Sequence, residues 1–143
     1  MEHSGTSHSD RAPEPVGAYP HARRVGNLLF LSGIGPRKRG SSEIPGVTLD
    51  KYGRATDHDI TPQCESCFAN VRSVLEDAGS SWDRIVDVTV FLTDIKRDFA
   101  AYNACFAEHF AGDGNPNPTR TTVEVTALPT PIAIELKVIA TIG

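Results

Sequence analysis

The order of its periodic segments constrains the fold of this 143-residue chain most strongly. Apolar or β-branched runs typical of strands lie at residues 22–25, 28–33, 85–92, 121–125 and 132–142. Two segments with apolar or small residues at helical spacing, 62–78 and 97–110, lie between them. The order strand, strand, helix, strand, helix, strand, strand predicts an α+β fold, with one mixed sheet and both helices packed on a single face.

Turn and cap residues set the expected boundaries of these segments. Gly26 and Asn27 predict a two-residue hairpin turn between the first two strands. Thr61 is the expected N-cap of the first helix, with Pro62 at its first position and Gly79 as its stop.

The runs at 28–33 and 132–142 are too apolar to face water on the side that the helices leave open. We therefore expect that face to be apolar and buried by self-association, most economically in a closed symmetric ring.

Length and composition indicate a single domain at residues 16–143. Residues 1–15 are rich in His, Ser, Pro and charge without an apolar period, and predict a flexible leader. Residues 34–58 carry many Gly and Pro and predict a long loop of the kind that often serves function. A net charge of −4 supplies no electrostatic footprint for nucleic acid.

The chain contains no apolar run near the roughly 20 residues that cross a bilayer. Its start lacks the features of a signal peptide, and three cysteines form no disulfide framework. We expect a cytoplasmic protein with reduced thiols and no membrane partner.

Two charged residues stand in β-prone surroundings near the end of the chain. Arg120 begins one strand, where its fork of donors suits a carboxylate. Glu135 interrupts an apolar run, so its carboxylate must be paired, solvated by a cleft or raised in pKa. These residues alone equally fit a structural ion pair at a sheet edge or subunit contact.

Cys64-x-x-Cys67 and Cys105-x-x-x-His109 have the spacing of zinc ligands. Both pairs lie in expected helices whose apolar stripes also explain buried cysteines. Zinc remains an alternative to this core interpretation, and we expect no metal.

Four motifs together resemble the Rid (reactive intermediate deaminase, or YjgF) family. They are LSG at residues 31–33, YNA at 102–104, PTRTTVEV at 118–125 followed by Leu128-Pro129, and the Ile134-Glu135 pair. The resemblance extends over residues 16–142.

The resemblance implies a chorismate-mutase-like (ferredoxin-like) fold, a homotrimer or dimer of trimers with clefts between subunits, and no cofactor. It also implies hydrolysis of imines or enamines to ketones and ammonia. By the matching positions, Arg120 binds the substrate carboxylate and Glu135 positions water. The same matches place Tyr19, Ser32, Gly33, Asn103 and Thr122 in the cleft.

Departures from the family pattern point to a specialist. Ile34 and Thr122 stand where many members carry Gln and Cys, and the segment 36–52 is longer than in minimal members. It resembles that of the 2-aminomuconate deaminases of aromatic catabolism, which form 4-oxalocrotonate and ammonia. Arg37, Lys38 or Arg39 would then meet the second carboxylate.

Three alternatives to this specialist remain open. One is a general deaminase of 2-iminobutanoate and 2-iminopropanoate, and another is a non-catalytic trimer that binds carboxylates. The third is a chaperone-like or RNA-directed role, as ascribed to some relatives, and the acidic balance of the chain argues weakly against RNA.

Overall fold

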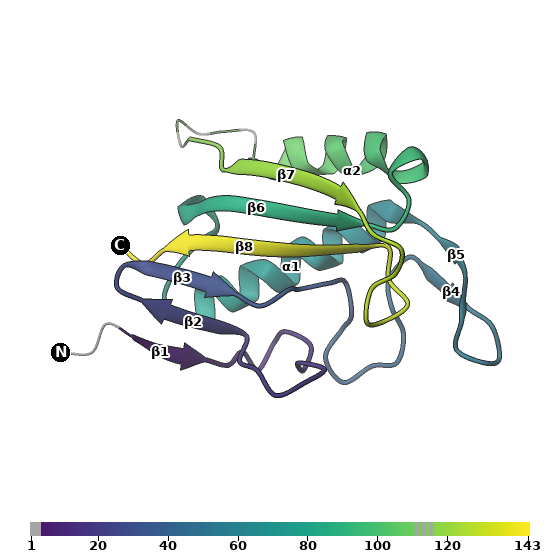
Figure 1. The fold of residues 1–143 in the computed structure, drawn as a ribbon, viewed down its shortest axis with the longest axis horizontal. Helices are drawn as coiled ribbons and strands as arrows, with labels where there is room; N and C mark the ends of the chain where they lie inside the picture. The colour runs from purple at the N-terminus through teal and green to yellow at the C-terminus, as the bar shows by residue number, and fades with distance from the viewer. Residues whose placement is uncertain (1–3, 111, 113, 115) are drawn as a thin grey trace.

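A computed structural model describes residues 4–110, 112, 114 and 116–143. A six-stranded sheet runs in the order β1-β2-β3-β8-β6-β7 (Figure 1). Its strands are β1 Ser4–Ser7, β2 Ala22–Val25, β3 Leu28–Leu31, β6 Ile85–Leu92, β7 Thr119–Glu124 and β8 Ile134–Thr141.

The predicted mixed sheet with two helices on one face is confirmed. Strands β6 and β7 run parallel, whereas the other neighbours in the sheet are antiparallel. Helices α1 (Ile60–Asp77) and α2 (Ile95–Phe110) both lie behind the sheet in Figure 1. Each parallel pair needs a crossover, and α2 supplies the one between β6 and β7.

The core lies between these helices and the sheet. In β6 and β8 alternate residues are buried, as the two-residue period of a strand requires. They meet the apolar stripe of α1. The largest fully buried side chains of this layer include Phe68, Leu75, Leu92, Tyr102, Ile134 and Leu136.

Local signals set most boundaries correctly. Gly26 has a φ of 60° and Asn27 has no positive φ, the combination that a type II′ hairpin turn uses. Gly79, with a φ of 88°, follows the end of α1 as expected. The predicted N-cap was wrong, because α1 begins earlier and Asp59 accepts a hydrogen bond from the Thr61 backbone N–H at 3.3 Å.

The expectation of a flexible leader is wrong for residues 4–15, while residues 1–3 lie outside the described residues. Residues Ser4–Ser7 form β1, which pairs with β2 at the edge of the sheet. Backbone hydrogen bonds to an available edge order this segment, and such pairing needs no apolar pattern.

The predicted loop at 34–58 contains a hairpin of its own. Strands β4 (Val47–Leu49) and β5 (Ala55–His58) pair antiparallel in a separate two-stranded sheet. They are too short and too exposed to show an alternating apolar pattern. Ile34 also forms an antiparallel bridge with Leu136 and so continues the pairing along the side of β8 that β3 occupies.

The face of the sheet opposite the helices is mixed rather than apolar, which corrects the expectation for it. Phe30, Phe91 and Ile139 are half-buried there, and Glu135 and Lys137 stand among them. Its burial by another copy of the chain stays a prediction. Within the described residues, no helix combines the length and apolar character needed to cross a bilayer.

Candidate functional site

A cavity of about 150 Å³ opens beside Glu135 at the end of the sheet where β8 begins. Three stretches of chain surround it: the segment before β2, the segment after β3, and the loop leading into β8. Its wall includes Pro13, Glu14, Tyr19, Ser32, Gly33, Arg37, Thr130 and Glu135. The cavity therefore brings together four residues that the resemblance assigns to a cleft.

The Glu135 carboxylate is held close to the backbone of Gly33. A Cβ atom on Gly33 would lie 2.8 Å from Glu135 Oε2, so only glycine leaves this carboxylate in place. Burial raises the pKa of Glu135, and the nearby positive charge of Arg37 partly offsets that rise. A half-buried carboxylate with a raised pKa is suited to exchanging protons with a substrate or a water molecule.

Tyr19 and Ser32 line the same cavity through defined local contacts. The Ser32 hydroxyl donates to the Pro20 carbonyl at 2.7 Å. The Tyr19 hydroxyl accepts from the Val16 backbone N–H at 3.2 Å, and the ring is 40% exposed. Tyr19 thus lies beside the Glu135 of its own chain.

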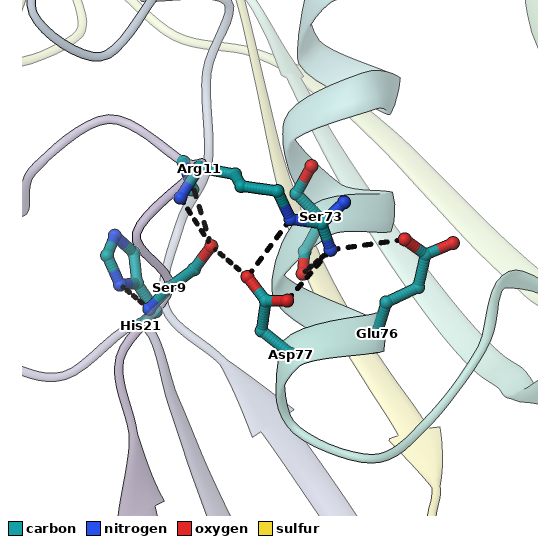
Figure 2. Close-up of polar contacts among 7 residues, drawn as sticks. Ser9, Arg11, His21, Ser73, Glu76 and Asp77 are labelled. Atoms are coloured by element: carbon teal, nitrogen blue, oxygen red, sulfur yellow. Dashed lines mark hydrogen bonds and ion pairs between the residues drawn. The ribbon is translucent and has the colours of Figure 1, made fainter.

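The segment at residues 12–16, which forms one wall of the cavity, is anchored to the end of α1 through Ser9. The Ser9 hydroxyl donates to Asp77 Oδ2 at 2.6 Å and accepts from the backbone N–H of Arg11 and Ala12. Arg11 adds ion pairs to Asp77 at 2.8 Å and Glu76 at 3.1 Å. Figure 2 shows these side chains converging on the last turn of the helix.

His21 belongs to the same anchor, and its tautomer follows from its partners. Nδ1 accepts from the Ser9 backbone N–H at 2.9 Å, so Nε2 carries the hydrogen and donates to the Pro13 carbonyl at 2.8 Å. Ser9, His21 and Asp77 therefore resemble a catalytic triad in composition only. Both ring nitrogens and the serine hydroxyl hold the N-terminal segment.

Arg120, Asn103 and Thr122 form a second cluster on β7 and α2, outside the lining of the Glu135 cavity. Arg120 Nη1 donates to Asn103 Oδ1 at 2.9 Å. The guanidinium lies over the rings of Phe106, at 4.7 Å, and Tyr102, at 5.3 Å. These contacts fix the arginine while it remains partly exposed.

Arg37, Lys38 and Arg39, the basic residues predicted to meet a second carboxylate, lie in different surroundings. Arg37 lines the cavity and donates to the Glu14 carbonyl at 2.8 Å. Arg39 instead donates to the carbonyls of Ser9 and Ala12. Lys38 is exposed and does not line the cavity.

Sequence reasoning missed the wall at 12–16, because a polar segment was interpreted as a leader. Pro13 and Pro15 carried a signal there, since proline restricts the backbone to extended conformations. It also missed Lys137, whose ammonium donates to the Leu31 carbonyl and whose pKa is lowered by burial. Its position two residues after Glu135 puts both side chains on one face.

Comparisons with known proteins agree with this architecture. A family model described as endoribonuclease L-PSP matches residues 9–142. A RutC family protein of Pyrococcus abyssi is 36% identical over 133 residues, which cover 92% of this chain and 92% of the relative. One of Haemophilus influenzae is 35% identical over 134 residues, covering 93% of each.

Solved structures match over almost the whole chain. The YjgF gene product of E. coli gives a TM-score of 0.81 at 31% identity and covers 96% of this chain and 98% of that one. E. coli TdcF with bound serine gives a TM-score of 0.81 at 30% identity, with the same coverage.

Proposed function

This chain belongs to the Rid family, described in its family model as endoribonuclease L-PSP, and on that premise we propose that it hydrolyses imines or enamines of carboxylic acids. Membership in this family supports a general imine or enamine deaminase or a related role. The observation that carries the proposal is the half-buried Glu135 carboxylate, raised in pKa at the wall of a small cavity.

The complete site needs both the Glu135 cavity and the Arg120 cluster. We infer that one copy of the chain supplies Glu135, Tyr19, Ser32 and Gly33, and that a neighbouring copy in a cyclic trimer supplies the Arg120 cluster. Arg120 would bind the substrate carboxylate through charge-assisted hydrogen bonds worth roughly 1.5–3 kcal/mol each. The serine bound to E. coli TdcF carries such a carboxylate, which supports this class of ligand.

The reaction needs only water and proton transfers. An enamine first takes a proton from solvent on carbon and becomes an iminium ion, which is the protonated imine. Glu135 then removes a proton from water as the water oxygen bonds to the iminium carbon, and a neutral carbinolamine forms. Glu135 returns this proton to the amine nitrogen, the C–N bond breaks as ammonia leaves, and the hydroxyl proton passes to solvent to give the ketone. A positioned base of this kind contributes on the order of 10²–10⁴ in rate.

Arg37 favours a dicarboxylate as the finer choice of substrate. Arg37 lines the cavity and its positive charge acts on the Glu135 carboxylate, so a second cation belongs to the site. 2-Aminomuconate is a conjugated enamine with two carboxylates, which Arg120 and Arg37 would bind at opposite ends. Its product is 4-oxalocrotonate with release of ammonia.

The test is ammonia release from 2-iminopropanoate and 2-iminobutanoate, generated in place from amino acids by an oxidase, and from freshly prepared 2-aminomuconate. Arg120→Ala and Glu135→Gln should each abolish most turnover. Arg54→Ala and Glu108→Gln change exposed residues away from both clusters and serve as matched controls.

The pattern across substrates separates the candidates. Turnover of 2-aminomuconate that falls in Arg37→Ala, with little activity on the monocarboxylates, supports the specialist. Turnover of the small imines alone makes the protein a general deaminase. Binding of carboxylates without turnover of any of the three compounds would contradict enzymatic function.

A further inference from the structure

Three side chains capable of binding a metal converge between α1 and α2, on the helix side of the sheet. Glu65 comes from α1, whereas Cys105 and His109 lie one turn apart on the same side of α2. Their ligand atoms all lie within 4.8 Å of one another. Glu65 was absent from the sequence motif, which paired the two α2 residues with Cys64 and Cys67.

The distances between these ligand atoms suit a metal ion with tetrahedral coordination. Cys105 Sγ lies 3.3 Å from Glu65 Oε1, and His109 Nε2 lies 3.0 Å from Glu65 Oε2. Ligand atoms bound to zinc at about 2.0–2.3 Å are separated by roughly 3.3–3.8 Å. Small side-chain shifts would therefore place the sulfur, the nitrogen and one carboxylate oxygen around one ion.

The residues around the three ligands fix their side chains and leave the group accessible to an ion from solvent. The His109 ring packs edge-on against Phe68, with ring centroids 4.9 Å apart, and also against Trp82. This packing directs Nε2 toward Glu65. Cys105 is 5% exposed, but the Glu65 side chain is 49% exposed, so an ion can reach the group from solvent.

We propose that Glu65, Cys105 and His109 form a binding site for zinc or a similar transition metal. A thiolate, an imidazole and a carboxylate match the ligand preference of Zn²⁺, and three protein ligands leave a fourth position for water. The site uses no residue of the Glu135 cavity or of the Arg120 cluster, so its metal binding can be tested without reference to the proposed deaminase function.

Binding of a metal ion must remove the proton from the Cys105 thiol. Without metal, Cys105 donates a hydrogen bond to Glu65, and burial together with this carboxylate raises the pKa of the thiol to about 12. An ion at the sulfur would displace that proton to solvent, while His109 binds in its neutral form.

Titration of the full-length, metal-stripped protein with Co²⁺ tests this site. Wild type should develop a thiolate-to-cobalt charge-transfer band at one ion per chain, and Zn²⁺ should remove it by displacement. Cys105→Ser and Glu65→Gln should each lose or strongly weaken the band. The second variant changes an exposed side chain, so it keeps the test valid if the first folds poorly.

Cys67→Ser is the matched control, because that thiol donates to the Ile34 carbonyl and lies outside the cluster. It should retain the band. Absence of a band in folded wild type would overturn the proposal. A band that survives both cluster variants, or that Cys67→Ser removes, would overturn it as well.

Discussion

Arg120 and Glu135 lie on opposite faces of the same sheet. Arg120 pairs with Val88 of β6, and Glu135 pairs with Phe91 of the same strand. Because successive residues of a strand alternate between faces, positions three apart point to opposite sides. Glu135 therefore lies on the face of the sheet that the helices leave uncovered, whereas Arg120 lies on the helix side and packs over Phe106 of α2. The joint action on one substrate that we propose for them would therefore use two copies of the chain.

This geometry predicts complementation between two inactive variants. Arg120→Ala and Glu135→Gln should each be inactive alone, but equal amounts unfolded and refolded together should recover about one quarter of the wild-type sites, by random assembly of a cyclic oligomer. Ammonia release measures the recovery. A site built within one chain would show none, and separately refolded samples mixed afterwards provide the control.

The pH dependence of kcat/KM should report Glu135. Activity should rise with pH through an apparent pKa above the ordinary carboxyl value, because burial raises the pKa of Glu135 and the base must be ionised. Arg37→Ala removes a positive charge that lowers the pKa of Glu135, so the acidic limb of the profile should move to higher pH. Arg54→Ala should leave the limb in place, and a limb unaltered in Arg37→Ala would contradict the assignment.

Glu135 should also make the protein less stable at neutral pH. Burial raises the pKa of Glu135 in the folded protein. Below the ordinary carboxyl pKa, Glu135 is protonated in both the folded and the unfolded state, so it does not lower the free energy of unfolding. As pH rises from that value through the raised pKa of the folded state, Glu135 ionises in the unfolded state first, and the free energy of unfolding falls. Glu135→Gln should therefore raise Tm at pH 7, with a difference that shrinks on acidification. Thermal melts across pH 4–8 measure it, with Glu108→Gln, at an exposed position outside the cavity, as the control.

Gly33→Ala should impair catalysis more than folding. The added Cβ would meet Glu135 Oε2 at 2.8 Å, and the end of a flexible side chain can move away. We expect kcat to fall by about 10–100-fold through displacement of the carboxylate, while Tm changes little. Steady-state kinetics together with a thermal melt distinguish this from unfolding. Gly40 has no neighbouring atom near its would-be Cβ but has a φ of 73°, so Gly40→Ala should lower Tm and leave kcat nearly unchanged.

Ser9→Ala should loosen the wall of the cavity. Loss of the buried hydroxyl leaves the backbone N–H of Arg11 and Ala12 without their acceptor, at a cost of about 1–3 kcal/mol. Amides of residues 9–16 should exchange hydrogen faster, and KM should rise more than kcat falls. Ser41→Ala, on an exposed loop, is the control. Unchanged exchange in Ser9→Ala would show that the wall does not depend on this anchor.

The segments with strong periodicity were predictable because their signals are local. The apolar run at Ile85–Leu92 and the stripe of α1 were correctly located, and so was the turn at Gly26. The edge strand Ser4–Ser7 and the β4–β5 hairpin were missed, because backbone pairing to a distant segment decides them. A polar four-residue strand carries no period of its own.

By itself the sequence determined the layer architecture and the family. The period of the apolar residues, the turn residues and the contiguous motif all depend on residues that are close together in the chain. The sequence also singled out Arg120 and Glu135 as charged residues in β-prone surroundings, and so as candidates for the site. Only the tertiary structure decided which groups meet. Strand register put these two residues on opposite faces, the segment after β3 brought Arg37 to the cavity of Glu135, and helix packing joined Glu65 to Cys105 and His109. These contacts join residues far apart in the chain, so no local pattern encodes them.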